Sequence, residues 1–358
     1  MDQAASIRVW PEAVAANFAA MRMRAGAAAA VVKADAYGLG LSGVVPALLD
    51  AGCDSFFVAR LEEGMALRAQ APKARIFVLD GAAAATLPAL IAHDLVPVLG
   101  SLAQIDTWRQ GRGGAAALHV DTGMNRLGLP LQDVTRAARR LEGVSLALVM
   151  SHLACGDDPA SPMNAVQLAR FKDALARLPS APASLAASGG VFLGRAYRFD
   201  SARPGIGLYG GHPQPGHGPN PMRCAVQLTG TVLQLRDVAA GESVGYGASF
   251  VAPAPMRIAT IALGYADGVL RGAGGRADVL LGGRRARLVG RVSMDLITAD
   301  ATGLDVAEGD EAELFGPGLA VDEAAAAWGT ISYELLTGLS RRVPRVYMER
   351  RCEPERLI

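Results

Sequence analysis

One lysine of this sequence stands where a reactive amine could be placed. Lys33 ends the apolar run of residues 30–32 and precedes a turn that contains Gly38 and Gly40. A lysine that abuts a buried strand loses solvation, and burial lowers its pKa and leaves a neutral amine able to form a Schiff base. On spacing alone, a structural role and a catalytic role for Lys33 are equally supported.

Other side chains that could do chemistry are expected where predicted strands end and loops begin. The polar residues in these positions are Arg126, His152, Ser188 and Arg203. Two tyrosines stand in glycine-containing stretches further along, Tyr246 in Val-Gly-Tyr-Gly-Ala and Tyr265 in Gly-Tyr-Ala-Asp-Gly. For a lone histidine after a strand, a structural hydrogen bond is the more common role. For a strand tyrosine, core or interface packing is as common as function.

The first part of the chain predicts alternating strands and helices. The short apolar runs typical of buried parallel strands are residues 28–32, 55–59, 75–79, 95–99, 116–120 and 145–150. Helical patterns lie between them, for example at residues 60–69 and 165–178. Such units form a (β/α)₈ barrel or a doubly wound sheet. Because chemistry in a barrel sits where strands end, the polar residues that follow the strands favour the barrel.

The pattern of predicted elements changes after a glycine- and proline-rich stretch at residues 210–221, which we interpret as a linker. The strands predicted beyond it are residues 226–235, 258–263, 277–281, 287–292 and 312–315, with a turn at 281–284 and a helical piece near 333–339. The prediction is an α/β protein with two domains. A (β/α)₈ barrel covers residues 9–225, and a mostly β C-terminal domain covers residues 226–358 and is joined by residues 1–8.

Composition excludes several classes of protein. Of the 358 residues, 51% are apolar and 19% charged, so the chain has enough apolar side chains to form a packed core. The net charge is +1 and no basic stripe is present, which argues against nucleic acid as a partner. The four cysteines, Cys53, Cys155, Cys224 and Cys352, are scattered and predict reduced thiols and no metal site. No export signal and no bilayer-length apolar run is present, so we expect a cytoplasmic protein without a membrane partner.

The stretch VVKADAYGLG at residues 31–40 closely resembles the cofactor-lysine signature of the alanine racemase family. Further matches run in order through most of the chain, which makes the resemblance far more specific than one motif. It implies a barrel that carries pyridoxal 5'-phosphate, a β-domain and a head-to-tail homodimer. By this resemblance Lys33 forms the Schiff base with the cofactor, and the Tyr37 hydroxyl donates to its phosphate.

The resemblance also implies the rest of the cofactor site. Arg203 matches the arginine that faces the pyridine nitrogen, His152 packs on the ring, and the hydroxyl of Ser188 with the N–H groups of Gly205 and Ile206 holds the phosphate. An always-charged donor keeps the nitrogen unprotonated, so the ring withdraws fewer electrons from a Cα carbanion. That restraint suits removal and return of a proton more than decarboxylation or transamination.

Three positions depart from the family pattern. Arg126 matches the arginine that reaches the cofactor's phenolic oxygen and the substrate carboxylate, but many members carry a carbamylated lysine where this chain has His119. The family usually has asparagine at the position of Ala187. Some members place a tyrosine near the phosphate and inner gate at the position of Arg341. His119 leaves open how Arg126 is oriented, and Arg341 leaves open the contact with the phosphate and gate.

Racemisation needs a proton removed from one face of Cα and delivered to the other, so a second acid/base group is expected opposite the lysine. The residues alone do not choose between Tyr246 and Tyr265. The resemblance assigns catalysis to Tyr246, contributed across the dimer interface, and a substrate-access role to Tyr265. It places the Met294 N–H of the partner chain on the substrate carboxylate. The remaining access-corridor residues are Asp157, Arg271 and Arg291.

The leading hypothesis is an isomerase that interconverts L- and D-alanine, for cell-wall supply or alanine catabolism. A broader racemase for serine, lysine or arginine on the same scaffold stays open because of His119 and Arg341. A non-catalytic pyridoxal phosphate protein would be a lone barrel, so residues 231–358 argue against it. A metal-assisted lyase or aldolase of related fold needs His and Cys ligands in the second domain, but all five histidines precede residue 218.

Overall fold

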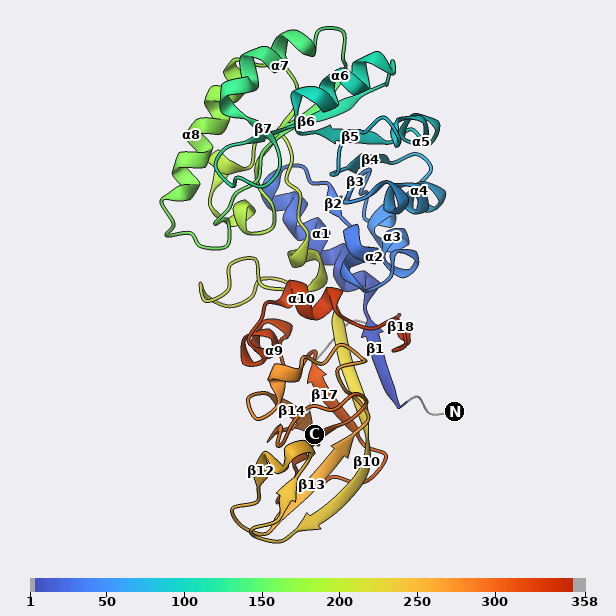
Figure 1. The fold of residues 1–358 in the computed structure, drawn as a ribbon, viewed down its shortest axis with the longest axis vertical. Helices are drawn as coiled ribbons and strands as arrows, with labels where there is room; N and C mark the ends of the chain where they lie inside the picture. The colour runs from blue at the N-terminus through green and yellow to red at the C-terminus, as the bar shows by residue number, and fades with distance from the viewer. Residues whose placement is uncertain (1–3, 350–358) are drawn as a thin grey trace. The chain divides into compact units, whose positions relative to one another are not determined.

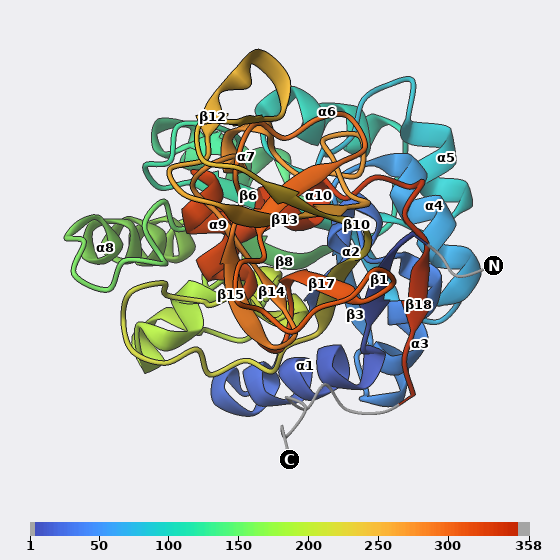
Figure 2. The same ribbon diagram turned by 90° about the horizontal axis from the view of Figure 1, so that it is seen from below.

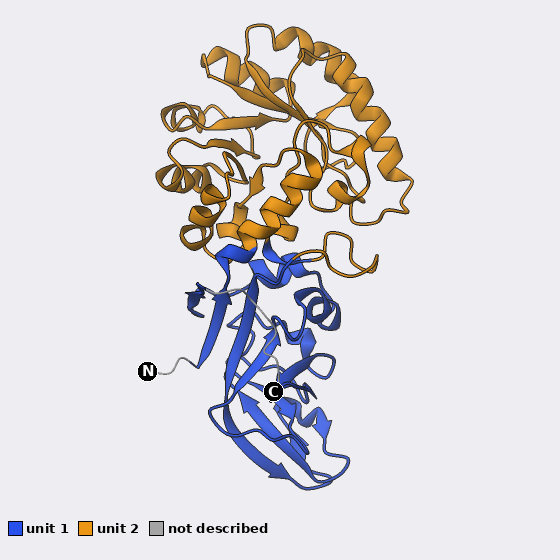
Figure 3. Cartoon of the chain, turned by 180° about the vertical axis from the view of Figure 1, so that it is seen from behind, with its two compact units in different colours: residues 1–13, 209–211, 223–358 blue, residues 14–208, 212–222 orange. Residues whose placement is uncertain are grey.

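The structure is a computed structural model that describes residues 4–349, and these form two compact units (Figure 3). One unit holds residues 14–208 and 212–222. The other holds residues 4–13, 209–211 and 223–349 of the described part. No helix within the described residues is long and apolar enough to cross a bilayer.

The first unit is built on a parallel sheet. Its strands, in spatial order, are β2 (Ala30–Val31), β3 (Ser55–Val58), β4 (Arg75–Val78), β5 (Val96–Leu99), β6 (Ala116–Asp121), β8 (Leu146–Met150) and β9 (Ala183–Ser184). A short strand, β7 (Leu129–Pro130), pairs with β6 as well. The strands are short apolar runs because both faces of a parallel sheet are covered. All six strands expected in this region are confirmed, with ends shifted by one or two residues.

Backbone hydrogen bonds close this sheet into a barrel. The segment 202–204 fills the eighth position, since the Ala29 N–H donates to the Ala202 carbonyl at 2.9 Å and the Arg203 N–H donates to the Ala186 carbonyl at 2.8 Å. Parallel bridges on both sides of the segment agree with these bonds. The predicted (β/α)₈ barrel is therefore confirmed, and the choice between a barrel and a doubly wound sheet is settled.

Helices cover the outside of the barrel (Figure 2). They are α1 (Pro11–Ala25), α3 (Leu41–Asp50), α4 (Leu61–Gln70), α5 (Leu87–Ala92), α6 (Leu102–Gln110), α7 (Val134–Arg140) and α8 (Met163–Ala176). The helices predicted at residues 60–69 and 165–178 are α4 and α8. Each helix follows a strand, so the loops that begin at the carboxyl ends of the strands meet at one mouth of the barrel.

The second unit is mostly β (Figure 1). Its long strand β10 (Val226–Val238) pairs antiparallel with β1 (Ala5–Val9), β13 (Met256–Ile261) and β17 (Glu311–Phe315). The other elements are β11 (Ser243–Val244), β12 (Phe250–Val251), β14 (Asp278–Leu281), β15 (Arg284–Arg287), β16 (Ile297–Asp300), β18 (Arg345–Tyr347), α9 (Val321–Trp328) and α10 (Ser332–Thr337). The N-terminal strand β1 thus belongs to the β-sheet unit.

Two expectations for this unit need correction. The strand predicted over residues 287–292 is wrong, because β15 ends at Arg287 and Leu288 makes only an isolated bridge to Ala299. Gly282 and Gly283, with φ of 55° and 72°, form a two-residue hairpin turn. The strand β15 therefore begins directly after the turn, at Arg284, and not at Arg287. Helix α9 was not predicted, although its buried positions follow helical spacing.

Candidate active site

Lys33 lies at the carboxyl end of β2, at the start of the turn labelled α2 (Lys33–Tyr37). The next four residues, none of them glycine, have φ between 53° and 57° and form a left-handed turn. Lys33 is half-buried, and the turn carries Tyr37 at its other end with only 5% of the tyrosine exposed. Burial first, and then the charge of Arg126, lowers the pKa of the Lys33 ammonium, so the amine loses its proton more easily than a solvated lysine.

The Ser188 hydroxyl, the backbone of Gly205 and the Tyr37 hydroxyl lie close together beside this turn. The Oγ of Ser188, a residue that is 2% exposed, accepts hydrogen bonds from the N–H groups of Gly205 at 3.0 Å and Gly207 at 3.2 Å. A Cβ added to Gly205 would lie only 2.2 Å from the Tyr37 hydroxyl oxygen. Backbone N–H groups and hydroxyls in such a glycine-lined cradle suit an anion, and glycine is required for the close approach. Ile206, next to Gly205, is buried and starts a 3₁₀ turn (Ile206–Tyr209).

Arg203 is buried in the same unit, with 4% of the residue exposed. Its guanidinium donates to the Ser184 hydroxyl and to the Ser151 carbonyl, and its central carbon lies 5.9 Å from the centroid of the Phe57 ring. Desolvation lowers the pKa of this arginine. Within residues 4–349 no carboxylate forms an ion pair with it, so its charge is directed only to neutral oxygens.

Arg126 is a second guanidinium without an acidic partner among residues 4–349. It is exposed, in the loop after β6. Asp121 stabilises that loop, because its carboxylate accepts from the backbone N–H groups of Gly123 and Met124 at 2.9 Å and of Asn125 at 3.0 Å. Arg203 and Arg126 are therefore each able to bind an anionic ligand without first breaking an ion pair.

Two histidines of the barrel unit are held neutral. Burial first, and then the charge of Arg203, lowers the pKa of His119 to about 4 and that of His152 to about 3. The Gln167 amide donates to the His152 carbonyl at 2.9 Å and fixes the backbone there. A neutral imidazole at His119 supplies no negative charge to orient Arg126.

These histidines predict acid sensitivity of the fold. Their folded pKa values lie below the unfolded value of about 6.5, so the unfolded chain binds more protons between those values. We expect the free energy of unfolding of the cofactor-free chain to fall as the pH falls from 6.5 toward 4. Chemical denaturation at several pH values measures this, and His119→Asn should weaken the dependence. An unchanged slope in that variant would contradict it.

The β-sheet unit brings its own candidate residues together. The Tyr265 N–H donates to the Ser293 carbonyl at 3.0 Å, and the Ala266 N–H donates to the Met294 carbonyl at 3.0 Å. Gly247 adjoins Tyr246, and a Cβ added there would lie 3.0 Å from the Arg291 guanidinium. Residues 290–294 therefore lie between the two tyrosine loops. Tyr246, Met294 and Tyr265 remain 72%, 53% and 45% exposed.

A buried aspartate supports these loops, and this role was not predicted although Asp267 lies in the motif that contains Tyr265. Asp267, 5% exposed, accepts from the Gly264 N–H at 2.8 Å and from the Nε and Nη2 groups of Arg342 at 2.6 and 2.9 Å. Arg342 also donates to Asp295 at 2.7 Å. This guanidinium thus joins the Tyr265 loop to the turn that carries Met294. The neighbouring Arg341 is exposed.

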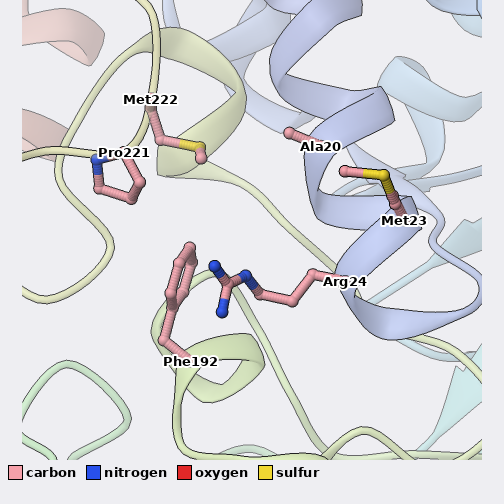
Figure 4. A pocket seen from close by; sticks show the side chains of 6 residues that line it. All are labelled: Ala20, Met23, Arg24, Phe192, Pro221 and Met222. Carbon is pink, nitrogen blue, oxygen red and sulfur yellow. The ribbon is translucent and has the colours of Figure 1, made fainter.

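The remaining predicted residues are exposed positions outside the α-helices and strands. They are Asp157 in the barrel unit and Arg271 and Arg291 in the β-sheet unit. A separate cavity of about 290 Å³ lies elsewhere in the barrel unit, between the carboxyl end of α1 and the 3₁₀ segment that contains Phe192 (Figure 4). The Arg24 guanidinium stacks there 4.5 Å from the centroid of the Phe192 ring. None of the predicted site residues lines this cavity.

Comparison with known proteins decides the family. Residues 9–213 match the alanine racemase N-terminal domain, and residues 225–347 match the alanine racemase C-terminal domain. The chain belongs to the alanine racemase family. A curated relative, alanine racemase of Rhodospirillum rubrum, is 51% identical over 353 residues, which is 94% of either chain.

Solved alanine racemases have the same fold. The biosynthetic alanine racemase of Pseudomonas aeruginosa matches with a TM-score of 0.93 and 39% identity, over 97% of this chain and 100% of that one. Alanine racemase of Bartonella henselae, solved with covalently bound pyridoxal phosphate, matches with a TM-score of 0.92 and 38% identity over the same shares. The likeness spans the barrel and the β-sheet unit together.

The three departures from the alanine racemase pattern can now be located. His119 is on β6, and its pKa is depressed in part by Arg126. Ala187 makes a parallel bridge with Arg203, so the backbone link to the arginine is kept although alanine adds no side-chain hydrogen bond. Arg341 directly precedes the arginine that pairs with Asp267. Each departure thus lies beside an arginine: His119 near Arg126, Ala187 next to Arg203, and Arg341 next to Arg342.

Proposed function

We propose that this chain interconverts L- and D-alanine with pyridoxal 5'-phosphate, using Lys33 and Tyr246 as the two acid/base groups. Family membership over nearly the whole chain supports the reaction and the cofactor. The observation that carries the proposal is the cradle of Tyr37, Ser188 and Gly205 beside a lysine of lowered pKa. It joins an anion site to an amine that can be neutral.

The residues of the barrel unit fit the cofactor. Tyr37, Ser188, Gly205 and Ile206 would hold its phosphate, and Lys33 would hold it covalently. Among the described residues Arg203 has no carboxylate partner and would face the ring nitrogen, while Arg126 and His152 would border the ring. When bound, pyridoxal phosphate supplies an electron-withdrawing ring that makes the Cα–H bond of an attached amino acid acidic.

Two groups on this protein would move the proton. On the path from L- to D-alanine, the Tyr246 hydroxyl oxygen takes the proton from Cα and the Lys33 amine delivers one to the opposite face; the roles exchange on the reverse path. Arg126 binds the substrate carboxylate together with the Met294 N–H. The Arg203 guanidinium, which donates hydrogen bonds and cannot accept them, would keep the ring nitrogen unprotonated and so limit side reactions.

We infer a head-to-tail homodimer in which Tyr246 and Met294 act on the partner's lysine site. The exposure of both residues in the single chain supports this arrangement. We also place the enzyme in the cytoplasm, because the cysteines are scattered along the sequence without the spacing of a disulfide framework. Cys352 lies outside the described residues. Roles in cell-wall supply and in alanine catabolism both fit.

Removal of the Ser188 hydroxyl should weaken cofactor binding. Ser188→Ala deletes the shared acceptor of the Gly205 and Gly207 N–H groups and so loosens the cradle. One or two hydrogen bonds of about 1 kcal/mol each predict a cofactor Kd raised about 5- to 30-fold. Titration of the cofactor-free variant, followed by absorbance, measures the Kd. An unchanged Kd would remove Ser188 from the cofactor site.

A racemase assay tests the proposed function. The holoenzyme is incubated with single L-amino acids, and the products are separated by chiral chromatography. We expect D-alanine at the highest kcat/KM, with serine, lysine and arginine far lower. Comparable turnover of those three would favour the broader racemase, and cofactor binding without any D-product would favour a non-catalytic protein.

A further inference from the structure

The turn that follows Lys33 is strained. Ala34, Asp35, Ala36 and Tyr37 have φ of 54°, 56°, 53° and 57°, a left-handed conformation that is unfavourable for every residue with a Cβ. Only Gly38, at 84°, adopts such a φ without that penalty. Four such residues in succession persist only when the surrounding structure holds them in place.

The far end of the turn is held by its own residues. The Gly38 N–H donates to the Ala34 carbonyl at 2.8 Å, and the Gly40 N–H donates to the Asp35 carbonyl at 2.9 Å. The Asp35 carboxylate accepts from the Leu41 N–H at 2.8 Å. These bonds fix the Tyr37 end to the start of α3, and the Ala36 N–H donates to the Val32 carbonyl at 2.9 Å across the lysine end. The N–H of the peptide that follows Lys33, that of Ala34, takes no part in these bonds within the turn.

Glu63, on the first turn of α4, holds that peptide. One carboxylate oxygen accepts from the Ala34 N–H at 2.7 Å, and the other accepts from the N–H groups of Ala59 at 2.7 Å and Arg60 at 3.1 Å. Ala34 is the residue next to Lys33, whereas Ala59 and Arg60 follow β3. The carboxylate therefore ties the end of the lysine strand to the end of the neighbouring strand.

We propose that Glu63 is a positioning residue for the reaction: its carboxylate fixes the left-handed turn and thereby the place of the Lys33 amine. A role as the cap of α4 alone would need only the oxygen that accepts from Ala59 and Arg60. The second oxygen reaches 29 positions along the chain to Ala34. This inference rests on the proposed function, because it gives Lys33 a task that depends on position.

The test compares Glu63→Gln with a capping variant elsewhere in the barrel. Glutamine keeps one acceptor oxygen, but its amide nitrogen cannot accept, so one of the two links is lost. Ser101→Ala is the matched control, because it removes the cap of α6, where the Ser101 hydroxyl accepts from the Gln104 N–H at 3.2 Å. The control loses a helix cap without a bond to the lysine turn.

Three quantities are measured on each holoenzyme: kcat, the thermal midpoint, and the fraction of Lys33 that borohydride fixes to the cofactor. We expect Glu63→Gln to lower kcat about 10- to 100-fold and to reduce the fixed fraction, because displacement by about 1 Å costs about that much. Ser101→Ala should lower the midpoint by a few degrees and leave kcat within about twofold.

A double variant separates position from charge. In Glu63→Gln with Ala34→Gly, glycine adopts the left-handed conformation without the Cβ penalty, so part of the lost kcat should return. No recovery would assign the loss to the missing charge and overturn the positioning role, as would wild-type kcat in Glu63→Gln. If borohydride fixes no cofactor on Lys33 of the wild type, the proposed function fails as well. If it fixes the same fraction of Lys33 in the wild type and in Glu63→Gln, only this inference is overturned.

Discussion

Lys33→Ala is expected to lower the racemisation rate by at least about 10⁴-fold, because it removes both the covalent anchor of the cofactor and one of the two acid/base groups. Alanine keeps the end of β2 apolar and removes a half-buried amine whose pKa is already depressed by burial, so the barrel should remain folded. Chiral chromatography of the alanine product measures the rate. Peptide mass spectrometry after borohydride treatment shows whether any lysine retains the cofactor.

Lys73, a lysine of the same unit that is not a predicted site residue, offers the matched control. Lys73→Ala should leave both the rate and the fixed cofactor at wild-type levels. A Lys33→Ala protein that still racemises alanine within about tenfold of the wild type, or wild-type cofactor fixed on Lys73, would contradict the assignment of Lys33.

Tyr246→Phe should lower racemisation by about 10²- to 10⁴-fold and leave cofactor binding intact, because only the hydroxyl that transfers a proton is removed. Tyr246 is 72% exposed in the single chain, so the fold does not depend on its hydroxyl. Tyr265→Phe, 45% exposed in the neighbouring loop, is the control and should retain most of kcat.

Exchange in deuterium oxide tests which of the two groups serves each face of Cα. If Lys33 serves the face of D-alanine, Tyr246→Phe should still exchange the α-hydrogen of D-alanine for deuterium while it forms almost no L-alanine. The α-hydrogen of L-alanine should exchange far more slowly. Proton NMR of both enantiomers reads the exchange. Equal loss of exchange for both would argue against separate groups for the two faces.

Local patterns were enough to predict most of the barrel. Short apolar runs mark buried parallel strands wherever they occur, and residues 55–59 and 116–120 form β3 and β6 with little change. Closure of the barrel was not visible locally, because the segment at Ala202 has no strand-like run and pairs with Ala29, which lies far away in sequence. The same limit applies to β15, whose start is set by the conformation of Gly282 and Gly283.

The site could be predicted only in part. Residues that stand at strand ends, such as Lys33, could be found by position, and the resemblance supplied their roles. The four left-handed residues after Lys33 could not be predicted, because their own φ preferences oppose the turn and part of its support comes from Glu63 on another element. The hydroxyl of Ser184 and the backbone carbonyl of Ser151, which accept from Arg203, were not predicted, although Ser151 directly follows the strand predicted over residues 145–150.

Mixed dimers test the central claim most directly, namely that one active site takes its lysine from one chain and its tyrosine from the other. Lys33→Ala and Tyr246→Phe proteins are mixed, dissociated and allowed to reassociate. A mixed dimer then has one site with both groups and one with neither, so random assembly should restore about a quarter of the wild-type activity. Activity no higher than that of the two variants kept apart would contradict the claim.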